Sequence, residues 1–157
     1  MKAQRFDAVL FVNVLAELPD PEAALRTAHA LLADGGLLIV RSCNDFNPLQ
    51  KAVSEHLGAG EYWVVDDRLS YFTYDTLGAL MEDCGFDPVY RQADFPMEMM
   101  ALLGLADARD PASGAEAHKR RVAFERALPP ETRRTLYRAF ARAGMGRSLF
   151  MAARKIS

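Results

Sequence analysis

Polar side chains follow two apolar segments of the chain that read as β-strands, residues 6–12 and 37–40. Asn13 comes directly after the first segment, and Asn44 and Asp45 follow the second. Because ligands bind outside the carboxyl ends of strands in open α/β sheets, all three are candidate binding residues. Asp45 can also accept a hydrogen bond or a proton from a substrate. Asparagine and aspartate are ordinary turn residues too, so a purely structural role stays open for each of them.

Two groups of large apolar side chains can form the walls of a pocket. The aromatic group is Tyr62, Trp63, Tyr71 and Phe72, and the methionine group is Met97, Met99 and Met100. Aromatic rings give rigid walls, and unbranched methionines give an adaptable surface. Both kinds of residue also fill hydrophobic cores, so ordinary packing is the alternative for both groups.

A basic segment near the carboxyl end offers charged candidates. His118 and Arg121 lie one helical turn apart, so both side chains can hold one anionic substrate. The basic residues after His118 are Lys119, Arg120, Arg121, Arg126, Arg133, Arg134, Arg138, Arg142 and Arg147. Only Glu125 and Glu131 oppose them there, which can attract a phosphorylated or nucleotide-linked substrate, or nucleic acid. Arginines on several helix faces without interleaved aromatic residues favour an ordinary solvated surface instead.

The elements that position these residues begin with strand 6–12, a helix and a second strand. Asp20 is the predicted cap of the helix and Pro21 its first residue, after which apolar residues recur at three-and-four spacing. Gly35 and Gly36 are predicted to end the helix, because glycine tolerates the left-handed backbone of a helix terminus. The apolar run 37–40 then follows as a strand. Short links make this unit a right-handed crossover and therefore a parallel sheet.

The rest of the chain is predicted to be mainly helical. The expected elements are a helix over 49–57, a helix from the Thr73 cap to Gly85, a strand over 86–92, a helical insertion over 96–146 and a closing strand over 147–155. Within the insertion, 107–114 is a predicted loop, and two prolines separate helices over 115–128 and 131–143. Strand 86–92 is less apolar than the first two, which places it nearer the edge of the sheet.

The composition is typical of a globular protein of one domain. The 157 residues are 50% hydrophobic and 25% charged, with a net charge of −2. Cys43 and Cys84 lack the spacing of a metal site or a disulfide, which predicts a reducing compartment. No apolar run approaches the ~20 residues needed to span a bilayer. We therefore expect a cytoplasmic protein without a metal site or a membrane anchor.

The first strand, residues 6–12, has an unusual position for its composition. It is apolar on both faces, as a strand inside a sheet would be, yet it begins five residues after the first Met. Either it is an edge strand whose free N–H and C=O groups recruit another strand, or its neighbour comes from elsewhere. The predicted partner is therefore a second copy or a second chain that pairs with residues 6–12.

Several segments together resemble a known family. They are FDxVL at 6–10, VLxxLPDP at 14–21, LLADGGLL at 31–38, YFTxxTL at 71–77 and CGF at 84–86. Their order and spacing resemble the second half of a class I S-adenosylmethionine-dependent methyltransferase. Four more segments, NDFNPLQ at 44–50, FPMEM at 95–99, HxxRxxxE at 118–125 and GR at 146–147, are similar to one bacterial subgroup of that family.

This resemblance implies a three-layer Rossmann-like methyltransferase fold. The expected sheet is truncated to about four strands, parallel with an antiparallel closing strand, and residues 1–157 form a single partial domain with the helical insertion inside it. The implied cofactor is S-adenosylmethionine. The Gly-rich turn and the acidic residue that hold this cofactor in the family have no counterpart in the sequence. The isolated chain is therefore expected to be inactive unless the missing half is supplied.

The resemblance also implies roles for individual residues. Asn13, Ala16 and Glu17 are the implied cofactor-binding residues. The implied substrate-binding residues are Asn44, Asp45, Tyr71, Phe72, Met97, Glu98, His118 and Arg121. Arg68 stands where the family often has His, and it cannot act as a general base at neutral pH, so the catalytic base stays unknown. The expected reaction is methyl transfer to a small-molecule acceptor, anionic or sugar-linked; the alternative is an inactive module that binds a partner through residues 6–12.

Overall fold

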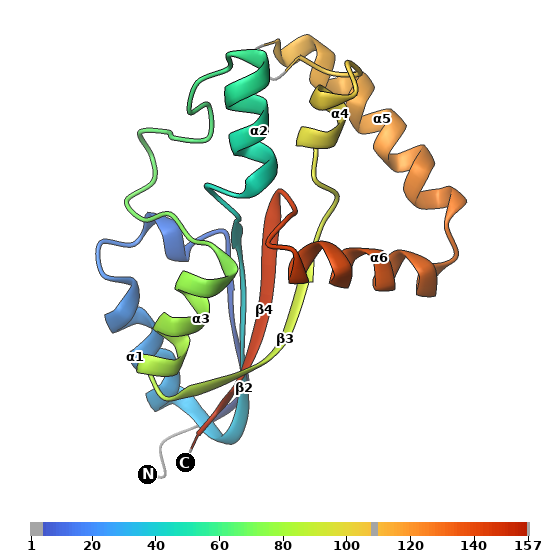
Figure 1. Cartoon of the computed structure of the whole chain (residues 1–157). Helices are drawn as coiled ribbons and strands as arrows, with labels where there is room; N and C mark the ends of the chain where they lie inside the picture. Colours follow the sequence, from blue (N-terminus) through green and yellow to red (C-terminus); the bar gives the residue numbers. More distant parts are fainter. Residues whose placement is uncertain (1–4, 108–109, 157) are drawn as a thin grey trace.

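The computed structural model describes residues 5–107 and 110–156. This part of the chain forms one four-stranded sheet with the strand order β1-β2-β4-β3 (Figure 1). The strands are β1 (Phe6–Val12), β2 (Leu32–Cys43), β3 (Phe86–Ala93) and β4 (Ser148–Lys155). β1 and β2 are parallel, whereas β4 runs antiparallel to its neighbours β2 and β3. The predicted sheet with an antiparallel closing strand is therefore confirmed.

Helices cover both faces of the sheet and extend beyond one end of it. They are the 3₁₀ helix η1 (Leu15–Glu17) and the α-helices α1 (Pro21–Leu31), α2 (Pro48–Leu57), α3 (Tyr74–Asp83), α4 (Glu98–Leu102), α5 (Pro111–Ala127) and α6 (Pro130–Arg142). Figure 1 shows α1 and α3 on one side of the sheet and α6 on the other, where α6 contacts β3. The helices α2, α4 and α5 lie beyond the ends of the strands. This arrangement gives the three layers expected of a Rossmann-like fold.

Helix starts follow the capping chemistry of the sequence. The Asp20 carboxylate accepts a hydrogen bond from the Ala23 backbone N–H (2.8 Å), as predicted for the start of α1. Thr73 caps α3 and forms a reciprocal capping box with Thr76. Asn47 caps α2 in the same reciprocal way. These helix starts are therefore determined by residues adjacent in the sequence.

The end of α1 differs from the prediction. The helix ends at Leu31 rather than at Gly35, and β2 begins with Leu32. Leu32 is fully buried and lies opposite Phe6 of β1, so burial and strand pairing both favour an extended backbone there. The register between β1 and β2 shifts just after this pair, and Gly35 has the positive φ of 72° that lets the strand bend.

The start of α5 also differs from the prediction, because the loop expected over 107–114 is shorter. The helix begins at Pro111, since the Asp110 side chain accepts a hydrogen bond from the Ala112 backbone N–H (2.9 Å) and caps it.

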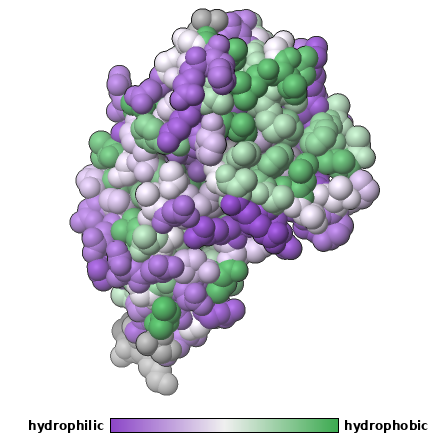
Figure 2. Space-filling model, viewed as in Figure 1, coloured by the Kyte–Doolittle hydropathy of each residue, from purple (hydrophilic) through white to green (hydrophobic). Residues whose placement is uncertain are grey.

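Figure 2 shows an apolar area over the α4 and α5 region of the surface. Leu102, Leu103, Leu105 and Phe124 are exposed large apolar residues of this region.

β1 is an edge strand of the described sheet. It pairs with β2 on one side, and no described strand pairs with its other side. Its apolar side chains are also poorly covered, with Phe6 44%, Leu10 59% and Val12 53% exposed. The sequence of β1 is therefore typical of a strand buried on both faces, but most of this strand is exposed in the described sheet.

The main hydrophobic core lies between the sheet and the pair α1 and α3. Leu25 of α1, Leu77 and Met81 of α3, and Leu38 and Val40 of β2 are all fully buried there. A second, smaller cluster of Phe95, Met100, Ala117 and Tyr137 joins α4, α5 and α6. The helical insertion thus has apolar packing of its own.

We expect Leu77→Ala to lower the free energy of unfolding by about 2–5 kcal/mol, because it removes buried methyl groups and leaves a cavity in the core. Leu69→Ala is the matched control: the Leu69 side chain is 62% exposed, so its loss should change stability by less than about 0.5 kcal/mol. Urea denaturation of both variants measures the difference. Equal losses would contradict this location of the core.

Candidate functional site

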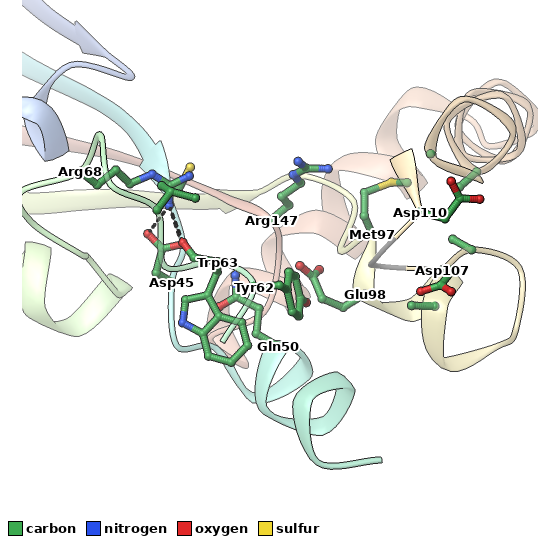
Figure 3. A pocket seen from close by; sticks show the side chains of 16 residues that line it. Asp45, Gln50, Tyr62, Trp63, Arg68, Met97, Glu98, Asp107, Asp110 and Arg147 are labelled. Atoms are coloured by element: carbon green, nitrogen blue, oxygen red, sulfur yellow. Dashed lines mark hydrogen bonds and ion pairs between the residues drawn. The ribbon is translucent and has the colours of Figure 1, made fainter. Parts of the chain in front are cut away.

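A cavity of about 360 Å³ opens beside the carboxyl end of β2 (Figure 3). Its walls come from the end of β2, α2, the loop after α2, the segment from α4 to α5, and the residue before β4. The polar and aromatic lining residues that matter most are Asp45, Tyr62, Trp63, Arg68, Glu98 and Arg147. The volume lies within the range of small-molecule binding sites.

Asp45 and Arg68 form an ion pair on one side of this cavity. Arg68 Nη1 donates to both carboxylate oxygens of Asp45, each at 3.0 Å. Burial raises the pKa of Asp45 above its ordinary value, and the charge and hydrogen bond of Arg68, with a hydrogen bond from Gln50, offset part of this effect. Since Arg68 already holds the carboxylate, the pair fastens the loop after α2 to the end of β2.

Glu98 lies on the other side of the cavity and forms no ion pair with the described residues. The residue is 6% exposed, and its Oε2 atom has no hydrogen-bond partner among the described residues. Burial raises the pKa of Glu98, while the Arg147 charge and a hydrogen bond from the Tyr62 hydroxyl act in the opposite direction. Figure 3 shows the Glu98 carboxylate beside the Tyr62 ring, away from the Asp45–Arg68 pair.

Trp63 is the second buried polar group without a partner. It is 6% exposed, and its indole Nε1 has no hydrogen-bond acceptor in the described chain. The indole ring meets Phe46 and Tyr62 edge to face, with ring centroids 5.7 Å and 5.1 Å apart. Two lining residues of the cavity thus each carry a buried polar atom without a partner in the described chain, and such atoms are normally satisfied in proteins.

The structure brings three of the predicted substrate residues to the cavity: Asp45, Met97 and Glu98. Asn44, the neighbour of Asp45, is not among the lining residues. Its side-chain Nδ2 donates to the carbonyl oxygens of Gly144 (2.9 Å) and Gly146 (3.0 Å), and the residue is 1% exposed. Asn44 therefore has the structural role that the sequence left open.

Tyr71 and Phe72 also lie outside the lining of the cavity. Phe72 is buried in the main core. The Tyr71 hydroxyl donates to the carbonyl of Val65 (2.9 Å) and accepts from the Val65 N–H (3.1 Å), so it braces the loop after α2. Both residues belong to the loop after α2, which carries Trp63 and Arg68, and they anchor it through the Tyr71–Val65 hydrogen bonds and the burial of Phe72 in the core.

His118 and Arg121 lie on α5 and do not line the cavity. Arg121 is paired with Glu125 at 2.8 Å on the same helix, and one guanidinium nitrogen lies 3.3 Å from His118 Nδ1. Other arginines of this helical segment are paired too, for example Arg134 with Glu131. This pairing favours a solvated surface over an anion-binding site.

The implied cofactor-side residues lie at the carboxyl end of β1. Asn13 has a positive φ of 56°, and its Oδ1 accepts a hydrogen bond from Arg41 Nη1 (2.8 Å). Ala16 is buried, and its carbonyl accepts hydrogen bonds from Leu69 N (2.9 Å) and Ser70 N (3.0 Å). Glu17 is exposed to solvent. These residues share one edge of the sheet, and their assignment to the cofactor stays a prediction.

Sequence reasoning missed several lining residues. Gln50 and Cys43 carry no local pattern that separates them from a buried helix or strand residue, and burial raises the pKa of the Cys43 thiol. Arg147 belongs to the Gly-Arg pair at 146–147, and Asp110 to a segment expected to be a loop. In residues 5–107 and 110–156 no group of His, Cys, Asp or Glu could hold a metal ion, and no helix is long and apolar enough to cross a membrane.

The sequence matches a family model described as a methyltransferase domain over residues 1–91. Ubiquinone biosynthesis O-methyltransferases of Cereibacter sphaeroides and Ruegeria pomeroyi are 33% and 35% identical to the chain over 96 and 94 residues. Each match covers 57% of this chain and 37% of the relative. The chain thus spans little more than a third of the length of these curated relatives.

Solved structures show the same fold. An S-adenosylmethionine-dependent methyltransferase of Archaeoglobus fulgidus superposes with a TM-score of 0.56 at 12% identity, covering 98% of this chain and 61% of the other. A methyltransferase of Bacillus halodurans gives a TM-score of 0.53 at 16% identity, covering 100% of this chain and 67% of the other. At these identities the likeness concerns the fold alone.

We expect Glu98→Gln to stabilise the protein at alkaline pH. Because burial raises the pKa of Glu98, its contribution to stability is fully present below the ordinary carboxyl pKa of 4.5 and is lost as pH rises through the folded-state pKa. Glutamine keeps the shape and cannot ionise. The variant should therefore equal the wild type at low pH and exceed it near pH 8 by on the order of 1 kcal/mol.

Thermal unfolding across this pH range measures the effect. Glu55→Gln serves as the control, because Glu55 is exposed on α2 and should give parallel curves for the variant and the wild type. A wild type that matches Glu98→Gln at alkaline pH would show that Glu98 is not held in a costly ionised form.

Proposed function

Since the family model covers more than half of the chain, the protein belongs to the methyltransferase domain family, and we propose that its cavity binds the methyl acceptor. The observation that carries this proposal is the pair of unpartnered buried groups, Trp63 Nε1 and Glu98 Oε2, which line one cavity. The cavity lies outside the carboxyl end of a strand, where ligands bind in open α/β sheets. Its volume of about 360 Å³ fits a small molecule.

The family implies S-adenosylmethionine as the methyl donor. The residues present do not fit this cofactor by themselves. Asn13 Oδ1 and the Ala16 carbonyl already accept hydrogen bonds from Arg41 and from the loop after α2. The sequence also lacks the Gly-rich turn and the acidic residue at a strand end that would hold the adenosine part of the cofactor in this fold. We therefore propose that this chain supplies the acceptor side of the site.

The proposed contribution of these residues is positioning. Methyl transfer by direct displacement needs the acceptor atom aligned with the methyl group and shielded from water. Met97, Ala101 and Ala117 give apolar walls that exclude water, and the Asp45–Arg68 pair fastens the loop after α2, which forms another wall, to the end of β2. Arg68 stays protonated and cannot remove a proton from the acceptor.

An assembly role is the second candidate, and the exposed apolar side chains of β1 favour it. Phe6, Leu10 and Val12 are 44%, 59% and 53% exposed, and no described strand pairs with the outer side of β1. A strand from a second chain or a second copy would satisfy these backbone groups and cover these side chains. The same contact would place a cofactor-binding half beside Asn13.

We expect the 157-residue chain to bind S-adenosylmethionine negligibly, because the residues present do not form a cofactor site. Calorimetric titration of S-adenosylmethionine into the purified chain measures this, with the full-length Cereibacter sphaeroides relative as the positive control. Micromolar binding to the chain alone would refute the proposed division of the site.

We expect the chain to self-associate through β1, and Leu10→Lys to reduce this association, because a buried lysine at a new strand pair is costly. Light scattering across a range of concentrations measures the mass. Val89→Lys is the matched control: Val89 is 50% exposed on β3, at the opposite edge of the sheet. A wild-type monomer at every concentration would count against self-pairing.

A further inference from the structure

We propose that the cavity recognises an amine, with a ligand ammonium group bound to the Glu98 carboxylate and an apolar body between the aromatic and aliphatic walls. This inference rests on the proposed function of the cavity as the acceptor site and names the chemical class of the acceptor. The family model ends at residue 91, so it does not cover Glu98. The resemblance implies a substrate-binding role for Glu98 and gives no chemical class for the ligand.

The first step of the argument is the state of Glu98. The residue is 6% exposed, and one of its carboxylate oxygens has no hydrogen-bond partner among the described residues. A buried carboxylate is costly unless a cation or several donors face it. An ammonium group both donates a charge-assisted hydrogen bond and neutralises the carboxylate charge, whereas a hydroxyl only donates, so the ammonium group offsets this cost better.

The second step is the charge of the lining. It contains four carboxylates, from Asp45, Glu98, Asp107 and Asp110, and two guanidinium groups, from Arg68 and Arg147. Arg68 is committed to Asp45 at 3.0 Å. Arg147 is exposed, and no ion pair joins it to Glu98 in the described chain. With Asp107 left out of the count, the described lining outside the Asp45–Arg68 pair carries two carboxylates, Glu98 and Asp110, and one guanidinium group, Arg147. This balance favours a cation over the anionic acceptor expected from His118 and Arg121.

The third step is the aromatic wall. Tyr62 and Trp63 meet at 79° with ring centroids 5.1 Å apart, so they present faces in two directions. Aromatic faces attract cations, and the effect grows when water is excluded. Figure 3 shows Glu98 next to Tyr62, with Trp63 on the side of Asp45. An ammonium group at Glu98 can thus meet a ring.

Protonation gives the inference a signature in the wild-type protein. The groups that act on Glu98 are Arg147, Asp94 and the Tyr62 hydroxyl, and burial raises its pKa. A proton and an ammonium group then compete for the same carboxylate. Amine binding should strengthen as pH rises and Glu98 loses its proton, as long as the amine itself stays protonated. Binding of a neutral alcohol should not strengthen in this range.

Trp63 makes the experiment direct, because it is the single tryptophan of the chain and lines the cavity. Benzylamine, benzyl alcohol and benzoate are titrated into the 157-residue chain, and tryptophan fluorescence is followed at about pH 5.5 and about pH 8. We expect benzylamine to bind at least about tenfold more tightly than the alcohol at the higher pH, and more tightly there than at the lower pH. Equal or tighter binding of the alcohol or of benzoate would overturn the proposal.

Glu98→Gln tests the carboxylate itself, and Glu55→Gln is its control on an exposed part of α2. Glu98→Gln should remove the preference for benzylamine over benzyl alcohol, whereas Glu55→Gln should keep it. Circular dichroism checks that both variants fold. If Glu98→Gln does not fold, the pH dependence of amine binding to the wild type tests the inference. Retained amine preference in a folded Glu98→Gln variant would exclude Glu98 as the ammonium site.

The outcome is separable from that of the proposed function. Amine binding is measured without S-adenosylmethionine, so a failed methyl-transfer assay does not affect it. A cavity that binds the alcohol or benzoate better would overturn the amine inference and leave the acceptor site in place. A cavity that binds none of the three probes would overturn both.

Discussion

The hydrogen bonds of Asn44 hold the site together. Its side chain donates to the carbonyls of Gly144 and Gly146, which joins the end of β2 to the turn that leads into β4, about one hundred residues later. Gly146 has a φ of 115°, and a Cβ there would lie 2.6 Å from the Cβ of Ala93, so the turn needs a glycine. The positions of Asp45 and Arg147 in the cavity depend on this junction, because Asp45 follows Asn44 directly and Arg147 follows Gly146.

Two buried carboxylates of the cavity differ in what surrounds them. Asp45 is held by Arg68, so its burial cost is offset within the protein and its effect is to fix the loop after α2. Glu98 is about as deeply buried, yet one of its oxygens lacks a partner in the described chain. A satisfied carboxylate supports structure, and an unsatisfied one points to a ligand. The same test separates Tyr71, whose hydroxyl is satisfied by Val65, from Trp63, whose N–H is not.

In the proposed arrangement, the sheet has an acceptor side and a side that binds a partner chain. The ends of β2 and β4 carry the cavity, while β1 presents exposed apolar side chains and an unpaired outer edge in the described structure. The same architecture recurs in methyltransferases of known structure over nearly the whole chain. An open α/β sheet binds its ligands outside the carboxyl ends of its strands. A cofactor held by the partner chain and an acceptor held by the cavity would therefore meet at this end of the sheet.

Local chemistry determined the elements and their order from the sequence alone. The bounds of β1, the caps at Asp20 and Thr73, and the presence of a closing strand follow from neighbouring residues, whose pattern and hydrogen bonds act over a few positions. The antiparallel direction of the closing strand was implied by the family resemblance, because it depends on pairing with β2 and β3. Contacts far apart in the chain decided the rest. Leu32 belongs to β2 rather than to the predicted helix, because it pairs with Phe6 in the sheet. Asn44 and Asp45 have different surroundings, and Glu98 is a buried acid with one unpartnered oxygen in the described chain, because burial and partner geometry arise only when distant segments pack together.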